Sequence, residues 1–364
     1  MANALNRKGY RVTAICCEPI QGKPGYLIDK EVRFLNAYKP SFISFVYKNP
    51  FRNLRCISFN KKKRHLKRAL LNHEWQRRSI KETLQNIPKA DLFISYQAET
   101  TFILKDNLNI QEPIITMFHC SPMVEFNTIT FPLYKKSIEQ CAAVQVLMPE
   151  YIDVARKTLS TVPIIHIPNF VPQCTAEPNY SAKKIIVVAR VTNGKRPILL
   201  LEAMGLLKKE FPDWSCEWWG EDDQDIKLTR QIKTIIKNKK LENKFFLKGA
   251  TNNIFEKLQD ASIFALPSKS EGFGLALTEA LSIGLPAIAC KDCSALNTLI
   301  QNGSNGLLTE STPEFFAAGL AKLMRNQELR KKLGQQGKRD MKIYSPDVIW
   351  DKWDQLIQSI LNKK

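Results

Sequence analysis

The feature that most constrains the fold of this chain is the alternation of short apolar runs with helical patterns. The runs are rich in β-branched and aromatic residues, and between them apolar residues recur at helical spacing. Strands separated by helices pair in parallel, because a parallel pair needs a long crossover. The expected strands are Arg11–Ile15, Ser41–Val46, Leu92–Tyr96, Ile114–Phe118, Ala143–Leu147, Ile164–Ile167, Lys184–Val188, Cys216–Trp219, Phe245–Leu247, Ile263–Leu266, Ala287–Ala289 and Gly306–Leu308. The sequence therefore predicts an α/β protein with parallel sheets.

A pause in this rhythm predicts two domains. The polar stretch Pro172–Ser181 interrupts the alternation, and 364 residues exceed what one hydrophobic core usually organises. We predict two doubly wound, Rossmann-like domains, residues 1–174 and 175–344, joined near residue 175. The last segment, residues 345–364, carries apolar residues at helical spacing, and we expect it to form a helix that packs back on the first domain.

Positive charge is concentrated near the start of the chain. Of a net charge of +19, residues 1–89 contribute 20 Lys and Arg against 5 Asp and Glu, that is 20 − 5 = +15. The densest part, Lys61–Arg68, would be attracted to anionic lipid head groups by about 1 kcal/mol per basic residue. A solvated helix face and nucleic-acid binding are alternatives, but no zinc finger, helix-turn-helix or RNP-type aromatic pair accompanies the cluster. We predict contact with an anionic membrane surface, and no nucleic-acid partner.

Other compositional signals restrict the cellular setting. No apolar run is long enough to span a bilayer, and Met1–Lys8 lacks the apolar core of a signal peptide. The nine cysteines are scattered, which suits reduced thiols, and the pair Cys290 and Cys293 lacks a second pair at zinc-binding spacing. We expect a cytoplasmic protein, peripheral at the inner face of the membrane, with no metal site.

One loop combines features of a nucleotide-sugar diphosphate site. After the expected strand Ile263–Leu266, Gly272 and Gly274 let the backbone approach a ligand, and the helix that follows offers free N–H groups to an anion. Glu271 and Glu279 are eight residues apart, roughly 12 Å along a helical path, which suits two ends of one extended ligand. A carboxylate also accepts the two hydroxyl hydrogens of a vicinal diol. Each feature alone is compatible with an ordinary turn or surface acid; together they predict a ligand site.

A second loop supplies cations. Arg190 and Lys195 follow the expected strand Lys184–Val188, at the carboxyl end where open parallel sheets bind ligands. Arginine offers a fork of N–H donors to phosphate oxygens, and lysine offers a point charge. Loop cations exposed only to water are the alternative. The two loops together predict a diphosphate-binding edge.

These motifs resemble those of glycosyltransferase family 4, whose members have the GT-B fold of two Rossmann-like domains facing across a cleft. The resemblance covers roughly residues 1–340 and is strongest from 184 to 310. The arginine and lysine of the second loop match the family's G-R-L…K clamp with Ala189 in place of the first Gly, and Ile167–Phe170 is similar to its I-P-N-G. The E-x7-E signature and its flanks are matched by Glu271-Gly272-Phe273-Gly274-Leu275, Glu279-Ala280, Gly284-Leu285-Pro286-Ala287-Ile288-Ala289 and Asn302-Gly303-Ser304-Asn305-Gly306-Leu307-Leu308.

The resemblance implies a role for each matching position. Arg190 and Lys195 would neutralise the diphosphate of the donor, and Glu279 would hold its ribose hydroxyls. Glu271 and the backbone of residues 272–275 would contact the transferred sugar and the β-phosphate. His119 resembles the family's histidine that faces the sugar from the first domain, although a purely structural histidine is the alternative. Family members retain the anomeric configuration and need no metal or cofactor.

The resemblance also implies the reaction. It predicts a hexosyltransferase that moves a sugar from a nucleotide diphosphate, most simply a UDP-sugar, to a glycan or lipid-linked acceptor in cell-surface polysaccharide synthesis. One departure favours an alternative: Met1–Lys8 reads as the end of a helix, so the family's first strand and Gly-Gly loop are expected to be missing. The alternative is a catalytically impaired nucleotide-sugar-binding or scaffold protein, and a basic nucleic-acid binder ranks third.

Overall fold

The chain forms two compact units, each built on parallel β-structure. The structure is a computed structural model that describes residues 1–17, 27–37, 61–222 and 225–363, with the side chains of residues 61–72 outside the description. Unit 1 comprises Met1–Ile167 and Trp350–Lys364, and unit 2 comprises Pro168–Ile349. The division falls at residue 167, a few residues before the polar stretch that suggested a boundary near 175.

Unit 2 is built on a six-stranded sheet whose order reverses at its first strand. All neighbouring strands are parallel, in the order β12-β11-β10-β7-β8-β9. The chain extends the sheet from β7 to one side and then returns to add β10 on the other side, so β7 and β10 form the switch point. The strands are β7 (Lys184–Val188), β8 (Ser215–Trp219), β9 (Phe245–Gly249), β10 (Ile263–Leu266), β11 (Ala287–Cys290) and β12 (Gly306–Thr309).

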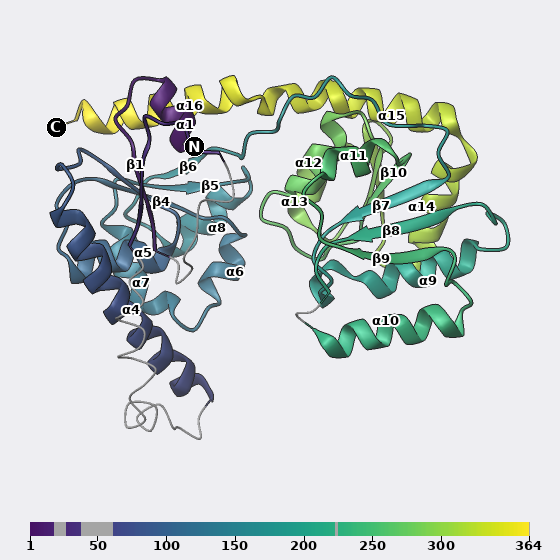
Figure 1. Cartoon of the computed structure of the whole chain (residues 1–364), viewed down its shortest axis with the longest axis horizontal. Coiled ribbons are helices and arrows are strands. Elements are labelled where there is room, and N and C mark those ends of the chain that lie inside the picture. Colours follow the sequence, from purple (N-terminus) through teal and green to yellow (C-terminus); the bar gives the residue numbers. More distant parts are fainter. Residues whose placement is uncertain (18–26, 38–60, 223–224, 364) are drawn as a thin grey trace. The chain divides into compact units, whose positions relative to one another are not determined.

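Helices cover both faces of this sheet, as in a doubly wound fold. Figure 1 shows α9 and α10 on the opposite side of the strands from α11 and α12. The core on the α9 side buries Trp218, Phe316 and Ile185 completely. The helical elements are η2 (Asn193–Lys195), α9 (Pro197–Leu207), α10 (Ile226–Asn238), α11 (Ile254–Gln259), α12 (Leu275–Ser282), α13 (Ser294–Leu299), α14 (Pro313–Arg325), α15 (Gln327–Asp340) and η3 (Met341–Tyr344).

Unit 1 contains a four-stranded and a two-stranded parallel sheet. The larger has the order β3-β4-β5-β6, and the smaller pairs β1 with β2. The strand β2 was not predicted, because its short sequence R-F-L-N has exposed polar ends. The predicted strand Ser41–Val46 lies outside the described residues. The elements are α1 (Ala2–Arg7), β1 (Thr13–Cys16), β2 (Arg33–Asn36), α4 (Lys61–Gln85), β3 (Phe93–Ser95), α5 (Ala98–Phe102), η1 (Ile103–Asn107), β4 (Ile114–Met117), α6 (Pro122–Phe126), α7 (Phe131–Glu139), β5 (Ala143–Val146), α8 (Tyr151–Thr158) and β6 (Ile164–His166).

The last helix, α16 (Pro346–Leu361), contacts the first residues of the chain within unit 1. The Lys8 ammonium group lies 2.6 Å from the Asp351 carboxylate. The Tyr10 hydroxyl donates to Asp354 at 2.5 Å and accepts from Gln358 at 2.7 Å. These polar contacts fix α16 along the start of unit 1. Across the described ranges, no helix is both long and apolar enough to cross a membrane, and every cysteine is a free thiol.

Candidate active site

The two loops that the sequence singled out meet at the switch point of the unit 2 sheet. β7 and β10 are neighbours, so the residues that follow them emerge side by side at the carboxyl edge. A backbone hydrogen bond of 2.8 Å from the Lys269 N–H to the Gly194 carbonyl joins the loops directly. Ligands of doubly wound sheets bind outside the strand ends at such a point. The predicted phosphate and carboxylate residues are thus brought to one edge.

An ion pair connects the loops through their functional side chains. The Lys195 ammonium nitrogen lies 2.5 Å from Oε1 of Glu271, seventy-six positions away in the sequence. Only 22% of the lysine side chain and 11% of the glutamate side chain are exposed, so water screens this pair less than a surface pair. The pairing matters chemically, because a lone carboxylate would repel a diphosphate, whereas this one is already compensated.

The glycine loop turns sharply into helix α12. Gly274 has a φ of 81°, in the left-handed region that favours glycine, and its position immediately precedes the helix. It offers no side chain to accept hydrogen bonds from the N–H groups of the first turn, so these remain available to an anion. The Phe273 side chain is 2% exposed and packs edge-on against Tyr344, with ring centroids 5.5 Å apart. Phe273 can therefore meet a ligand only through its backbone.

Glu279 is a half-buried acid on α12. Burial raises the pKa of its carboxyl group above the usual value. Among the described residues, no side chain or backbone group forms a hydrogen bond or ion pair with that carboxylate. A carboxylate held under such conditions lowers the stability of the fold, and this is typical of functional sites.

Arg190 is positioned by the backbone on both sides of it. The Ala189 N–H donates to the Trp219 carbonyl at 2.9 Å, and the Val191 N–H donates to the Glu221 carbonyl at 2.8 Å. The arginine side chain is exposed at the carboxyl end of β7. These two hydrogen bonds fix the backbone from which the Arg190 side chain extends, at the edge of the sheet where β7 ends.

The Asn302–Leu308 segment of the resemblance builds the scaffold. Asn305 is 1% exposed, and its amide donates to the Leu299 carbonyl at 3.1 Å and to Asp340 at 2.8 Å. Its carbonyl oxygen accepts from the Gln301 N–H at 2.8 Å. These bonds shape the turn into β12 and leave Asn305 no surface for a ligand.

His119 lies in unit 1, after β4, and so belongs to a different unit from the residues above. Its ring stacks on Tyr96, with centroids 5.4 Å apart and planes 14° apart. Burial lowers the pKa of the His119 imidazole, which favours the neutral form. Sequence reasoning did not select Tyr96, although its place at the end of an expected strand was a usable signal.

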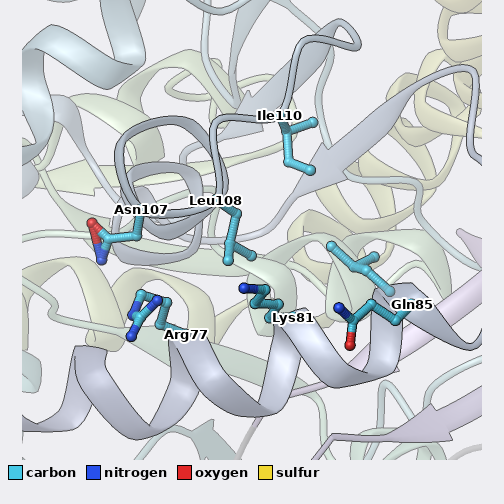
Figure 2. Close-up of a pocket in the computed structure, with 7 residues that line it drawn as sticks. Arg77, Lys81, Gln85, Asn107, Leu108 and Ile110 are labelled. Carbon is cyan, nitrogen blue, oxygen red and sulfur yellow. The ribbon is translucent and has the colours of Figure 1, made fainter.

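A separate pocket in unit 1 involves none of these residues. It has a volume of about 280 Å³ and is lined by Arg77, Lys81, Leu84, Gln85, Asn107, Leu108 and Ile110. Figure 2 shows that its cationic wall comes from one helix, α4, which faces the segment after η1. No three His, Cys, Asp or Glu side chains in the described parts of the chain are grouped so that they could hold a metal ion.

Comparison with known proteins identifies the class of enzyme. Residues 176–340 match the model of the family "Glycosyl transferases group 1". An uncharacterized glycosyltransferase of Haemophilus influenzae is 26% identical over 360 residues, which cover 97% of this chain and 92% of that protein. This chain is a GT-B glycosyltransferase.

Further relatives and structures agree with this class. The Bacillus subtilis poly(glycerol-phosphate) alpha-glucosyltransferase is 28% identical over 171 residues, 47% of this chain but only 25% of that protein. Sucrose-phosphate synthase from Thermosynechococcus elongatus superposes with a TM-score of 0.78 at 14% identity, covering 100% of this chain and 92% of the other. Staphylococcus aureus TarM gives a TM-score of 0.68 at 24% identity, covering 77% and 58%. The predicted GT-B fold and hexosyltransferase class are confirmed, whereas the assignment to family 4 stays a prediction.

The raised pKa of Glu279 predicts a pH-dependent gain in stability when its charge is removed. In the folded glycosyltransferase this carboxyl group holds its proton to a higher pH than in the unfolded chain, so stability falls as the pH rises above the unfolded value of 4.5. We expect Glu279→Gln to unfold at a higher temperature than the wild type at pH 7.5, and the difference to vanish near pH 4. Differential scanning calorimetry measures this; Glu242→Gln, at an exposed position, is the control. A Glu279→Gln protein that is less stable at pH 7.5 would contradict the account.

Proposed function

We propose that this glycosyltransferase transfers a hexose or N-acetylhexosamine from a UDP-sugar, with retention of configuration and without a metal ion, to a glycan or lipid-linked acceptor. The observation that carries the proposal is the Lys195–Glu271 ion pair at the switch point, beside the open N-terminus of α12 and the half-buried Glu279. A cation, an anion-binding helix end and a diol-binding acid on one sheet edge match the three parts of a nucleoside diphosphate sugar.

Each residue has a distinct task in the proposed reaction. The bond from the anomeric carbon to the β-phosphate oxygen breaks, and negative charge develops on the leaving UDP. Lys195 and Arg190 stabilise this charge in the role that a divalent cation fills elsewhere. The acceptor hydroxyl bonds to the anomeric carbon, and its proton leaves with the diphosphate. Glu271 contacts the transferred sugar, and Glu279 holds the ribose.

The names of related proteins support a cell-surface glycan as the acceptor. They include the poly(ribitol-phosphate) alpha-N-acetylglucosaminyltransferase of Staphylococcus aureus and an amylovoran biosynthesis glycosyltransferase of Erwinia amylovora. Similar folds contain UDP, or UDP and glucose, as in Anabaena HepE. The chain spans 40% and 48% of the two named relatives. The proposed class of pathway is therefore the synthesis of a surface polysaccharide or a polyol-phosphate glycan.

Removing the proposed ligand groups should abolish most of the transfer. We expect Lys195→Ala and Glu279→Ala each to lower kcat/KM for the donor about a hundred-fold, because a single electrostatic contact to the transition state is worth about 3 kcal/mol. A radiolabelled UDP-sugar with membrane lipid extract as the acceptor source measures transfer. Lys269→Ala removes an exposed cation from the same loop and should leave the rate unchanged. Unchanged rates in both site variants would refute the proposal, and UDP-sugar binding without turnover in the wild type would favour the non-catalytic alternative.

We also propose that α4 contacts an anionic membrane surface. The run Lys61–Arg68 begins this helix, and the described half remains cationic because Arg77 and Arg78 share a single carboxylate, Glu74. Figure 2 shows Arg77 and Lys81 along the same helix, at the wall of the unit 1 pocket. A helix with this charge would hold the enzyme near a lipid-linked acceptor.

Vesicle binding tests this contact. Replacing Lys62, Lys63 and Arg64 by Gln should weaken binding to phosphatidylglycerol vesicles roughly a hundred-fold, since each basic residue contributes about 1 kcal/mol near the surface. The control removes equal charge from exposed positions of α10 in unit 2, by replacing Lys227, Lys233 and Lys237 with Gln. Co-sedimentation measures the affinity. Equal losses in the two triple variants would show that only net charge matters.

A further inference from the structure

A second ion pair lies immediately beside the proposed donor residues, and the proposed function gives it no role. The guanidinium group of Arg196 donates two hydrogen bonds to the carboxylate of Asp292, at 2.8 and 2.6 Å, across ninety-six positions. This fork-to-fork geometry is the most directional form of an ion pair. The Arg196 side chain is 19% exposed. The hydrogen bonds from Arg196 hold the pKa of the Asp292 carboxyl below its usual range, so the pair stays ionised.

The backbone of Arg196 adopts a conformation that needs external support. Its φ and ψ are both 51°, in the left-handed region that residues other than glycine rarely adopt. Pro197 follows it and disfavours a right-handed helical conformation in the residue before it. Such conformations persist where surrounding contacts hold them. The two hydrogen bonds to Asp292 are contacts of this kind, and they act on the residue next to Lys195.

The pair completes a closed ring of contacts through three loops. Lys195 binds Glu271, and the thiol of Cys293 lies near the Glu271 backbone, which lowers the pKa of that thiol against the larger opposite effect of burial. Cys293 is 2% exposed and follows Asp292 in the chain. Asp292 accepts hydrogen bonds from Arg196, which is the neighbour of Lys195, so the contacts form a ring. These loops follow β7, β10 and β11, which are consecutive strands in the sheet. A displacement of any one loop would therefore shift the ammonium group of Lys195 relative to Glu271.

We propose that the Arg196–Asp292 pair is a positioning device that holds Lys195 and Glu271 in the geometry required by the donor diphosphate. This inference rests on the proposed function, because it assumes that Lys195 meets the donor. Arg196 is not itself a phosphate ligand, because both terminal nitrogens of its guanidinium group donate to Asp292, whereas the Lys195 ammonium group makes one such bond to Glu271 and has three donors. The two roles make opposite predictions for the removal of Asp292. If Arg196 bound phosphate, the change would release Arg196 and strengthen donor binding. If the pair positions Lys195, the change would displace Lys195 and weaken donor binding.

The experiment compares UDP affinity by calorimetry with the KM values for donor and acceptor in four variants. Asp292→Ala removes the acceptor of the fork, Arg196→Gly removes its donor while easing the left-handed backbone, and the double variant removes both. Lys291→Ala is the matched control, because Lys291 lies on the same loop as Asp292 but its side chain pairs with Glu310, outside the ring. Thermal unfolding of each variant separates loss of positioning from loss of fold.

We expect each single variant to weaken UDP binding and to raise the donor KM about ten-fold, as for a misplaced binding group, with the acceptor KM unchanged. The double variant should be no worse than the worse single variant, because the pair acts as one unit. Tighter or unchanged UDP binding by a folded Asp292→Ala protein would overturn the positioning role, as would additive losses in the double variant. Failure of the wild type to bind UDP would instead refute the proposed function, and the inference with it.

Discussion

The ion pair between Lys195 and Glu271 is the contact on which the proposed site depends. Its atoms lie 2.5 Å apart at a largely covered edge of the sheet, where water screens charge weakly. In this setting the removal of one partner leaves the other uncompensated, which costs more than the loss of a surface pair. The pair also reduces the repulsion between the Glu271 carboxylate and a bound diphosphate, because the lysine charge compensates the carboxylate. The donor then enters a site whose charges are already arranged, so little reorganisation accompanies the departure of UDP.

The parallel sheet brings these groups together, and the surrounding residues limit how they can move. The order reversal between β7 and β10 places two loops at one point, and the Lys269–Gly194 backbone bond joins them there. The Arg196–Asp292 fork ties the loop after β7 to the loop after β11. Glu279 contributes differently, since its raised pKa means that the fold tolerates an unfavourable charge. Stability is thus lost at this position, which is expected where selection acts on ligand binding.

The sequence predicted the strands of unit 2 closely, because buried parallel strands are short apolar runs bounded by polar loops. It also selected Lys195 and Glu271, but not their contact, since a pairing across seventy-six residues depends on the strand order. Arg196 and Asp292 escaped notice for the same reason: each alone is an ordinary loop charge. β2 was missed because only its two central residues are partly buried. The boundary at residue 167 precedes the polar stretch, because contacts between residues define the two units, whereas the polar stretch shows only where the composition of the chain changes.

The most direct test of the proposed donor site is a crystal structure of the chain with UDP bound. We predict that the diphosphate lies at the switch point, within hydrogen-bond distance of the Lys195 ammonium group and the first N–H groups of α12, with the ribose hydroxyls on Glu279. UDP bound at another edge of the unit 2 sheet, or at the switch point with Glu279 out of reach of the ribose, would contradict it.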